Sequence, residues 1–139
     1  MVIAVDFDGT IVEHKYPEIG NEIPFATTTL RMLANENHRL ILWTVRHGEL
    51  LNEAIDWCKE HGVEFYAINK NHPEEKIDNE GGFSKINADI FIDDRNLGGL
   101  PNWGDIYNMI KENRSWKDIY SCKPDNEEPA KRKKKGWLW

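Results

Sequence analysis

The sequence has 139 residues, 40% of them apolar, which fits one domain with one substantial core. No apolar stretch approaches the roughly 20 residues of a membrane-spanning helix, and no secretory signal pattern is present. The net charge of −6 combines +3 over residues 123–139 with −9 over the preceding 122 residues, and such an acidic body argues against broad nucleic-acid binding. We therefore expect a cytoplasmic protein without a membrane or nucleic-acid partner.

The first predicted element is a buried strand over residues 2–6, where apolar and β-branched residues follow one another. Asp6 and Asp8 come at its end, and Gly9 then breaks the strand. Along an extended chain the two carboxylates lie on one side and Phe7 on the other. Ligands of open parallel sheets bind beyond the carboxyl ends of strands, so this acid pair is placed where such folds perform chemistry. The plain alternative is a turn, which Asp and Gly both favour.

Further helices and strands alternate along the chain, as helical spacing and continuous apolar runs indicate. In order we expect a helix from Pro24, a strand over 39–44, a helix over 51–58 ending near Gly62, strands over 64–68 and 89–93, and a helix from near Trp103. Loops are predicted over residues 11–23 and 69–84. The alternation predicts a Rossmann-like three-layer α/β/α fold with a central parallel sheet.

Residues 123–139 form a tail that differs in composition from residues 1–122, which we interpret as the folded domain. The tail contains the basic run Lys131–Lys135, followed by Trp137 and Trp139. Its charge predicts a disordered, solvated end. The tryptophans leave a second interpretation open, in which the tail docks on a neighbouring subunit of a homo-oligomer.

Polar side chains follow three of the predicted strands, and parallel strands bring such side chains to one edge of the sheet. These are Asp6 and Asp8 after the first strand, Thr44 after the second, and Asp93 and Asp94 after the fourth, with Lys85 just before the fourth. Clustered carboxylates repel one another unless a cation holds them. Oxygen ligands without His or Cys suit a hard ion, most simply Mg²⁺.

The same residues predict phosphoryl transfer. An Asp that the metal ion does not require as a ligand can attack phosphorus and form an aspartyl-phosphate. A second carboxylate can move protons to and from the oxygen of the leaving group. A hydroxyl and an ammonium group can hold the phosphoryl oxygens as charge develops on them.

Taken together, these residues resemble a known family. The segments Asp6-Phe7-Asp8-Gly9-Thr10, Thr44, Lys85 and Ile92-Asp93-Asp94 are similar to the four motifs of the haloacid dehalogenase superfamily of phosphohydrolases. The resemblance extends from residue 2 to about residue 100, and it makes residues 1–122 a hydrolase core domain of that type. The acid/base Asp of the family's phosphatases is present, which favours a phosphatase over a dehalogenase.

The resemblance implies a role for each acidic residue. Asp6 would be the nucleophile that takes the phosphoryl group, and it would also contact the metal. Asp8 would be the general acid/base, with its backbone carbonyl on Mg²⁺. Asp94 would bind the metal directly, and Asp93 would bind it directly or through water.

The resemblance also implies a phosphate-binding set that comprises Gly9, Thr44 and Lys85. Thr44 would donate a hydrogen bond to the phosphoryl group, and Lys85 would neutralise it together with the nucleophile. Lys70 and Lys76 compete with Lys85 for this role. Lys85 is preferred because it leads directly into the strand that ends in the Asp pair.

Spacing predicts that no cap domain is inserted. The 34 positions from Thr10 to Thr44 and the 41 positions from Thr44 to Lys85 are filled by the predicted elements and loops. Neither interval can house a further domain, so the site is expected to be open unless another subunit covers it.

Two further features have competing interpretations. Arg46 can face the same edge and bind a substrate anion, or it can be a surface arginine paired with Glu49 or Glu53. The loop after the first motif can line the substrate entrance, with His14 and Lys15 at the leaving group, or it can be a plain connection.

We therefore predict a cytoplasmic Mg²⁺-dependent phosphatase that hydrolyses a small phosphorylated metabolite through an aspartyl-phosphate on Asp6. One alternative is a phosphatase acting on a polymer, such as a nucleic-acid end or a phosphoprotein. Another is a regulatory module that binds the metal without turnover.

Overall fold

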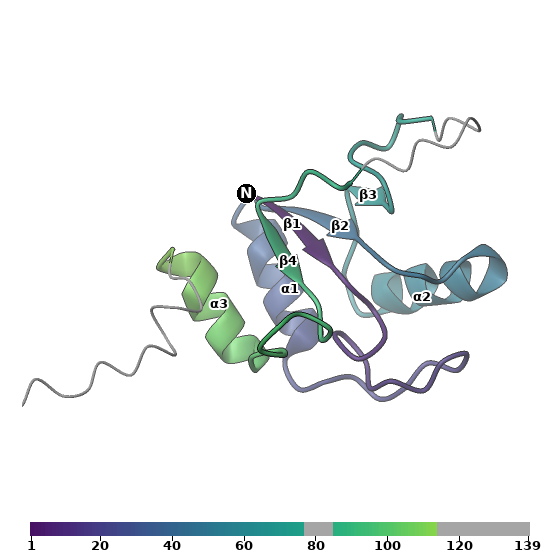
Figure 1. Cartoon of the computed structure of the whole chain (residues 1–139), viewed down its shortest axis with the longest axis horizontal. Coiled ribbons are helices and arrows are strands. Elements are labelled where there is room, and N and C mark those ends of the chain that lie inside the picture. The colour runs from purple at the N-terminus through teal and green to yellow at the C-terminus, as the bar shows by residue number, and fades with distance from the viewer. Residues whose placement is uncertain (77–84, 114–139) are drawn as a thin grey trace, which may run out of the picture. The chain divides into compact units, whose positions relative to one another are not determined.

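The computed structural model describes residues 1–76 and 85–113 of the chain. Within them, four parallel strands form one sheet in the order β3-β2-β1-β4, accompanied by three helices (Figure 1). The elements are β1 (Val2–Val5), α1 (Ala26–Asn35), β2 (Arg39–Leu42), α2 (Gly48–Glu60), β3 (Ala67–Ile68), β4 (Ile90–Ile92) and α3 (Trp103–Lys111). This is the predicted Rossmann-like α/β fold with a central parallel sheet, and the described residues contain no cap domain.

The core lies on both faces of the sheet, which is why its strands are continuous apolar runs rather than alternating ones. On one face, Ala4, Ile41 and Ala67 pack together with Ile86, from the segment that leads into β4. Ile3 and Val5 alternate with Ala4 along β1 and are also fully buried, so they fill the opposite face. Helix α1 contacts β2.

The register of the sheet brings the strand ends level with one another. Val5, the last residue of β1, pairs with Leu42 of β2 and with Ile92 of β4. Leu42 in turn pairs with Ile68, the last residue of β3. The residues that follow all four strands therefore emerge along one line, which we call the carboxyl edge.

The second strand ends two residues earlier than the sequence predicts, for a local reason. The N–H of Trp43 still donates to the Val5 carbonyl at 2.8 Å. The next N–H, that of Thr44, instead donates to the side-chain carbonyl of Asn69 at 2.8 Å. A side chain thus replaces the next bond of the ladder, and the backbone leaves the sheet before Thr44.

The chain divides by its internal contacts into a unit of residues 1–107 and a unit of residues 108–139. The predicted boundary at residue 122 and the tail over 123–139 lie outside the described residues. Among the helices of residues 1–76 and 85–113, none has the length and apolar character that crossing a bilayer requires.

Candidate functional site

Three carboxylates meet at the carboxyl edge. Oxygen atoms of Asp6, after β1, and of Asp93 and Asp94, after β4, all lie within 4.8 Å of one another, and each side chain is half-buried. Burial is the main cause that raises the pKa of Asp6 to about 7, and the negative charges of its Asp neighbours raise it further. A cation would relieve this repulsion, and the oxygen-only donor set fits a hard divalent ion such as Mg²⁺.

Thr10 holds two of these carboxylates together. Its buried hydroxyl lies 3.4 Å from Asp6 Oδ2 and 3.5 Å from Asp94 Oδ1, and it accepts the backbone N–H of Asp94 at 3.1 Å. The indole N–H of Trp103 donates to the Thr10 carbonyl at 3.0 Å. The sequence placed Thr10 in the first motif without a role of its own; in the structure it positions the cluster.

Gly9 contributes space rather than a phosphate-binding N–H. Its N–H donates to the Val12 carbonyl at 2.7 Å, so the predicted use of Gly9 for phosphate binding is not supported. Its φ is +82°, and a Cβ here would lie 2.4 Å from Asp94 Oδ2. Glycine is required because Asp94 approaches the backbone and because this φ disfavours other residues.

Asp8 is set apart from the three-carboxylate cluster by Arg46. The guanidinium Nε and Nη2 donate to the two carboxylate oxygens of Asp8 at 2.7 and 2.8 Å. Arg46 is 1% exposed and Asp8 7% exposed, so this is a buried bidentate pair. Both interpretations of Arg46 from the sequence need correction. The residue is not a surface partner of Glu49 or Glu53, and its N–H groups are already bonded to the protein rather than directed at a ligand.

Thr44 keeps its expected place at the carboxyl edge. Asn69, which follows β3 with a φ of +53°, accepts the N–H of Thr44 through its side chain. The Thr44 hydroxyl accepts the N–H of Arg46 at 3.1 Å. An oxygen that accepts in this way still carries a hydrogen that it can donate to another group. The sequence mentioned Asn69 only as a weak candidate for substrate contact.

Lys85 is not brought to the carboxylates, contrary to its predicted role. Ile86 beside it packs on the face of the sheet, and the chain then enters β4 from the amino-terminal end. Lys85 itself is exposed, with Nζ 5.9 Å from the ring centre of Phe91. Of its two competitors, Lys76 is exposed and Lys70 is half-buried, and neither lines the pocket that opens over the carboxylates.

A pocket of about 360 Å³ opens over Asp6, Asp8, Thr44 and Asp93. The rest of its wall consists of His14, Tyr16, Trp43, Val45 and Arg95. Three of these expose apolar surface, with Tyr16 44%, Trp43 38% and Val45 78% exposed.

The sequence singled out His14 among these wall residues and missed the rest of the apolar wall and Arg95. The signal that could have found Trp43, Val45 and Arg95 is their position at or just beyond the ends of predicted strands. Lys15, named beside His14, does not line the pocket.

A solved structure of a conserved protein from Bacteroides thetaiotaomicron matches this chain at 64% identity with a TM-score of 0.80, over 87% of this chain and 98% of that one. The chain belongs to the same family as that protein. No protein-family model and no curated protein matches the sequence. The Bacteroides relative is described only as a conserved protein, so the family shows the fold, and the functional argument rests on the site itself.

Proposed function

We propose that this chain is a Mg²⁺-dependent phosphatase of the haloacid dehalogenase type, which hydrolyses small phosphate monoesters through an aspartyl-phosphate on Asp6. The observation that carries the proposal is the half-buried carboxylate of Asp6 at the base of an open pocket, clustered with Asp93 and Asp94 and facing the same pocket as Thr44. An acid in this position is available both to a cation and to a phosphorus atom.

The three clustered carboxylates would hold Mg²⁺, joined by the backbone carbonyl of Asp8 as the family resemblance implies. When bound, the ion would neutralise charge on the phosphoryl oxygens and on the carboxylates. Thr10, which ties Asp6 to Asp94, would keep the donor oxygens in place without contacting the substrate.

Asp6 supplies the nucleophile of the proposed reaction. A carboxylate oxygen of Asp6 attacks phosphorus, and the bond from phosphorus to the substrate oxygen breaks. Asp8 in its protonated form gives a proton to the leaving oxygen, which departs as an alcohol. Water then attacks the aspartyl-phosphate, returns a proton to Asp8, and releases inorganic phosphate and the free carboxylate of Asp6.

In the arrangement that the structure shows, Asp8 is suited to act as the base in the second step, the hydrolysis of the aspartyl-phosphate. Both of its oxygens accept hydrogen bonds from Arg46, which is the arrangement of an ionised carboxylate. An ionised Asp8 can take the proton from the attacking water. To donate a proton to the leaving oxygen in the first half, Asp8 must first be protonated and give up at least one of the Arg46 bonds.

The remaining pocket groups suit the rest of the substrate. Thr44 would donate to a phosphoryl oxygen, and Arg95, which lines the same pocket, would supply the cationic role first assigned to Lys85. Tyr16, Trp43 and Val45 offer apolar surface to the leaving group.

The test is phosphate release from p-nitrophenyl phosphate and a panel of phosphorylated metabolites, with Mg²⁺ or with EDTA. Asp6→Asn should abolish turnover while the folded state persists, and Asp56→Asn, an exposed acid on α2, should match the wild type. Full activity in Asp6→Asn would refute the mechanism. Activity confined to nucleic-acid ends or phosphoproteins would indicate a polymer substrate, and Mg²⁺ binding without any turnover would indicate a regulatory module.

A further inference from the structure

Arg46 is the most completely bonded charged side chain at the site. Besides the two bonds to Asp8, Nη1 donates to the carbonyls of Pro17 at 3.1 Å and Leu50 at 3.3 Å. Nη2 also donates to the carbonyl of Glu18 at 3.0 Å. A guanidinium has five N–H donors, and these contacts use all of them. Arg46 therefore joins three parts of the chain: Asp8, the segment after the first motif, and the start of α2.

Two aromatic rings enclose the same guanidinium. Its central carbon lies 5.2 Å from the ring centre of Phe7 and 5.2 Å from that of Tyr16. Phe7 is fully buried and packs edge-on against Trp57 of α2 at 5.8 Å, so the Phe7 side of this stack is fixed. The Tyr16 side belongs to residues 14–18, which we call the entrance segment because His14 and Tyr16 line the pocket.

We propose that Arg46 is a positioning residue that fastens the entrance segment to Asp8, so that one side chain sets both the pocket wall and the acid/base carboxylate. The inference rests on the proposed function for the role of Asp8, but the fastening itself is a property of the fold. Residues 14–18 are exposed and lie between β1 and α1, outside any helix or strand. The carbonyl bonds and the Tyr16 stack supplied by Arg46 hold this segment against the site.

The fastening couples substrate binding to the state of Asp8. A leaving group that contacts Tyr16 or His14 stabilises the segment in place, and the segment in turn fixes the guanidinium that orients Asp8. Displacement of the segment removes the Pro17 and Glu18 carbonyls from Arg46 and frees it to move relative to Asp8. Lysine cannot reproduce this arrangement, because a single ammonium lacks the planar fork that reaches Asp8 and the carbonyls together.

The experiment compares Arg46→Lys with Arg31→Lys, an exposed arginine on α1 that serves as the matched control. Amide hydrogen exchange is followed at Glu13 and Ile23, which flank the entrance segment and donate to the carbonyls of Asn21 at 2.8 Å and Ile11 at 2.9 Å; we call this segment exchange. The constants kcat and KM are measured on the best substrate. In Arg46→Lys, segment exchange should rise about tenfold or more, the factor expected from the loss of two hydrogen bonds, while β1 and β2 keep their protection. KM should rise and kcat should fall together, and Arg31→Lys should change neither.

A second pair of variants covers the case in which Arg46→Lys does not fold. Tyr16→Ala weakens the fastening from the segment side and keeps the Arg46 guanidinium, so it should raise segment exchange, raise KM and lower kcat, with a smaller fall in kcat than in Arg46→Lys. The double variant Asp8→Asn/Arg46→Met removes both buried charges and should give the same increase in exchange.

The outcomes separate this inference from the proposed function. A fall in kcat alone in Arg46→Lys, with KM and segment exchange unchanged, would mean that Arg46 serves only Asp8, and the coupling would be overturned. Unchanged segment exchange in all three variants would overturn it as well. If the wild type shows no turnover, the proposed function fails, and exchange alone decides whether the fastening exists.

Discussion

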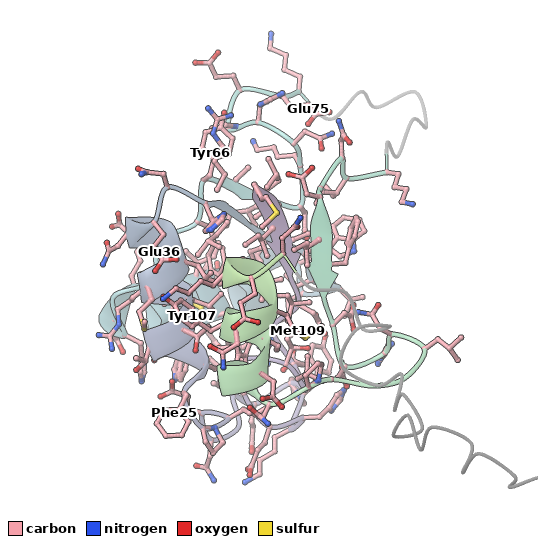
Figure 2. All side chains as sticks on the ribbon, turned by 90° about the vertical axis from the view of Figure 1, so that its left-hand side faces the viewer. Phe25, Glu36, Tyr66, Glu75, Tyr107 and Met109 are labelled. Carbon is pink, nitrogen blue, oxygen red and sulfur yellow. The ribbon has the colours of Figure 1, made fainter. Side chains whose placement is uncertain are left out.

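The two edges of the sheet carry pockets of nearly equal size, about 360 Å³ at the carboxyl edge and about 370 Å³ at the amino-terminal edge. Tyr66 and Glu75, which line the amino-terminal pocket, lie at one end of the molecule in Figure 2, and Phe25, before α1, lies at the other. The walls of both pockets include charged and polar side chains. Size and the presence of such side chains therefore do not distinguish the two edges.

The edges differ in how their polar groups are matched. At the amino-terminal pocket, Arg39 stacks over the ring of Tyr66 at 4.9 Å, and Glu75 and Asn71 accept backbone N–H groups at 2.7 Å each. At the carboxyl edge, half-buried carboxylates face one another, and the pKa of Asp6 is raised to about 7. Clustered carboxylates without a cationic partner lower the stability of the folded state. In enzymes, such clusters with shifted pKa values are commonly found where a ligand binds.

The largest expected effect comes from removing one acid at each edge. Asp94→Asn takes a charge from the cluster and should lower kcat/KM at fixed Mg²⁺ by about a hundredfold or more. Asp89→Asn is the matched change just before β4, where the carboxylate accepts the Val2 N–H at 2.7 Å, and it should leave kcat/KM within about twofold. Steady-state kinetics across a Mg²⁺ titration gives both numbers. Equal losses in the two variants would remove the distinction between the edges.

A stability effect follows next in size, from two glycines with similar backbone conformations. Gly9 has a φ of +82°, and a Cβ added to it would lie 2.4 Å from Asp94 Oδ2. Gly98 has a φ of +97°, and a Cβ added to it would meet open space. Gly9→Ala should lower the free energy of unfolding by about 3 kcal/mol, from backbone strain and displacement of Asp94, and Gly98→Ala by about 1 kcal/mol, from strain alone. Urea denaturation measures both. Similar losses would show that Asp94 moves aside without cost.

The sequence predicted the parts of this molecule that depend on local pattern and strand direction. Continuous apolar runs located β1, β2 and β4. The rule that parallel strands end at one edge correctly brought Asp6, Thr44 and the Asp93–Asp94 pair into one region. The third strand was predicted over 64–68 and is formed only by Ala67–Ile68, because few of its residues pair with β2.

The remaining errors concern side chains whose partners lie far along the chain. Arg46 and Asp8 are 38 residues apart, and no periodicity or spacing indicates that a residue after one strand turns back to pair with an acid after another. Lys85 was assigned by its proximity in sequence to β4. A residue that precedes a parallel strand approaches it from the amino-terminal end, so that proximity does not bring Lys85 to the carboxylates.

Arg95 and Lys85 give a direct comparison of smaller size. Arg95 lines the pocket at the carboxyl edge, and Lys85 lies exposed near the ring of Phe91. Arg95→Ala should lower kcat/KM about tenfold to a hundredfold, since a positive charge near the phosphoryl group is lost, and Lys85→Ala should have no measurable effect. Kinetics on the same substrate decides. A larger loss in Lys85→Ala would restore the assignment made from the sequence.

The smallest expected effect is the pH dependence of stability in the metal-free protein. Asp6 has a pKa of about 7 in the folded state against 3.8 as its ordinary value, so the folded state binds the proton more tightly. Its stabilising contribution is complete below about pH 4 and is lost as the pH rises through about 7. In EDTA, the Tm of the wild type should therefore fall from about pH 5 to about pH 8 relative to that of Asp6→Asn, which lacks this titration.

Asp89→Asn should keep the wild-type dependence, because its carboxylate lies outside the cluster. Added Mg²⁺ should flatten the wild-type curve, because a bound cation stabilises the ionised cluster in the folded state only. Parallel curves for the wild type and Asp6→Asn would show that the carboxyl edge does not hold a strained acid, and the contrast between the two edges would then lose its physical basis.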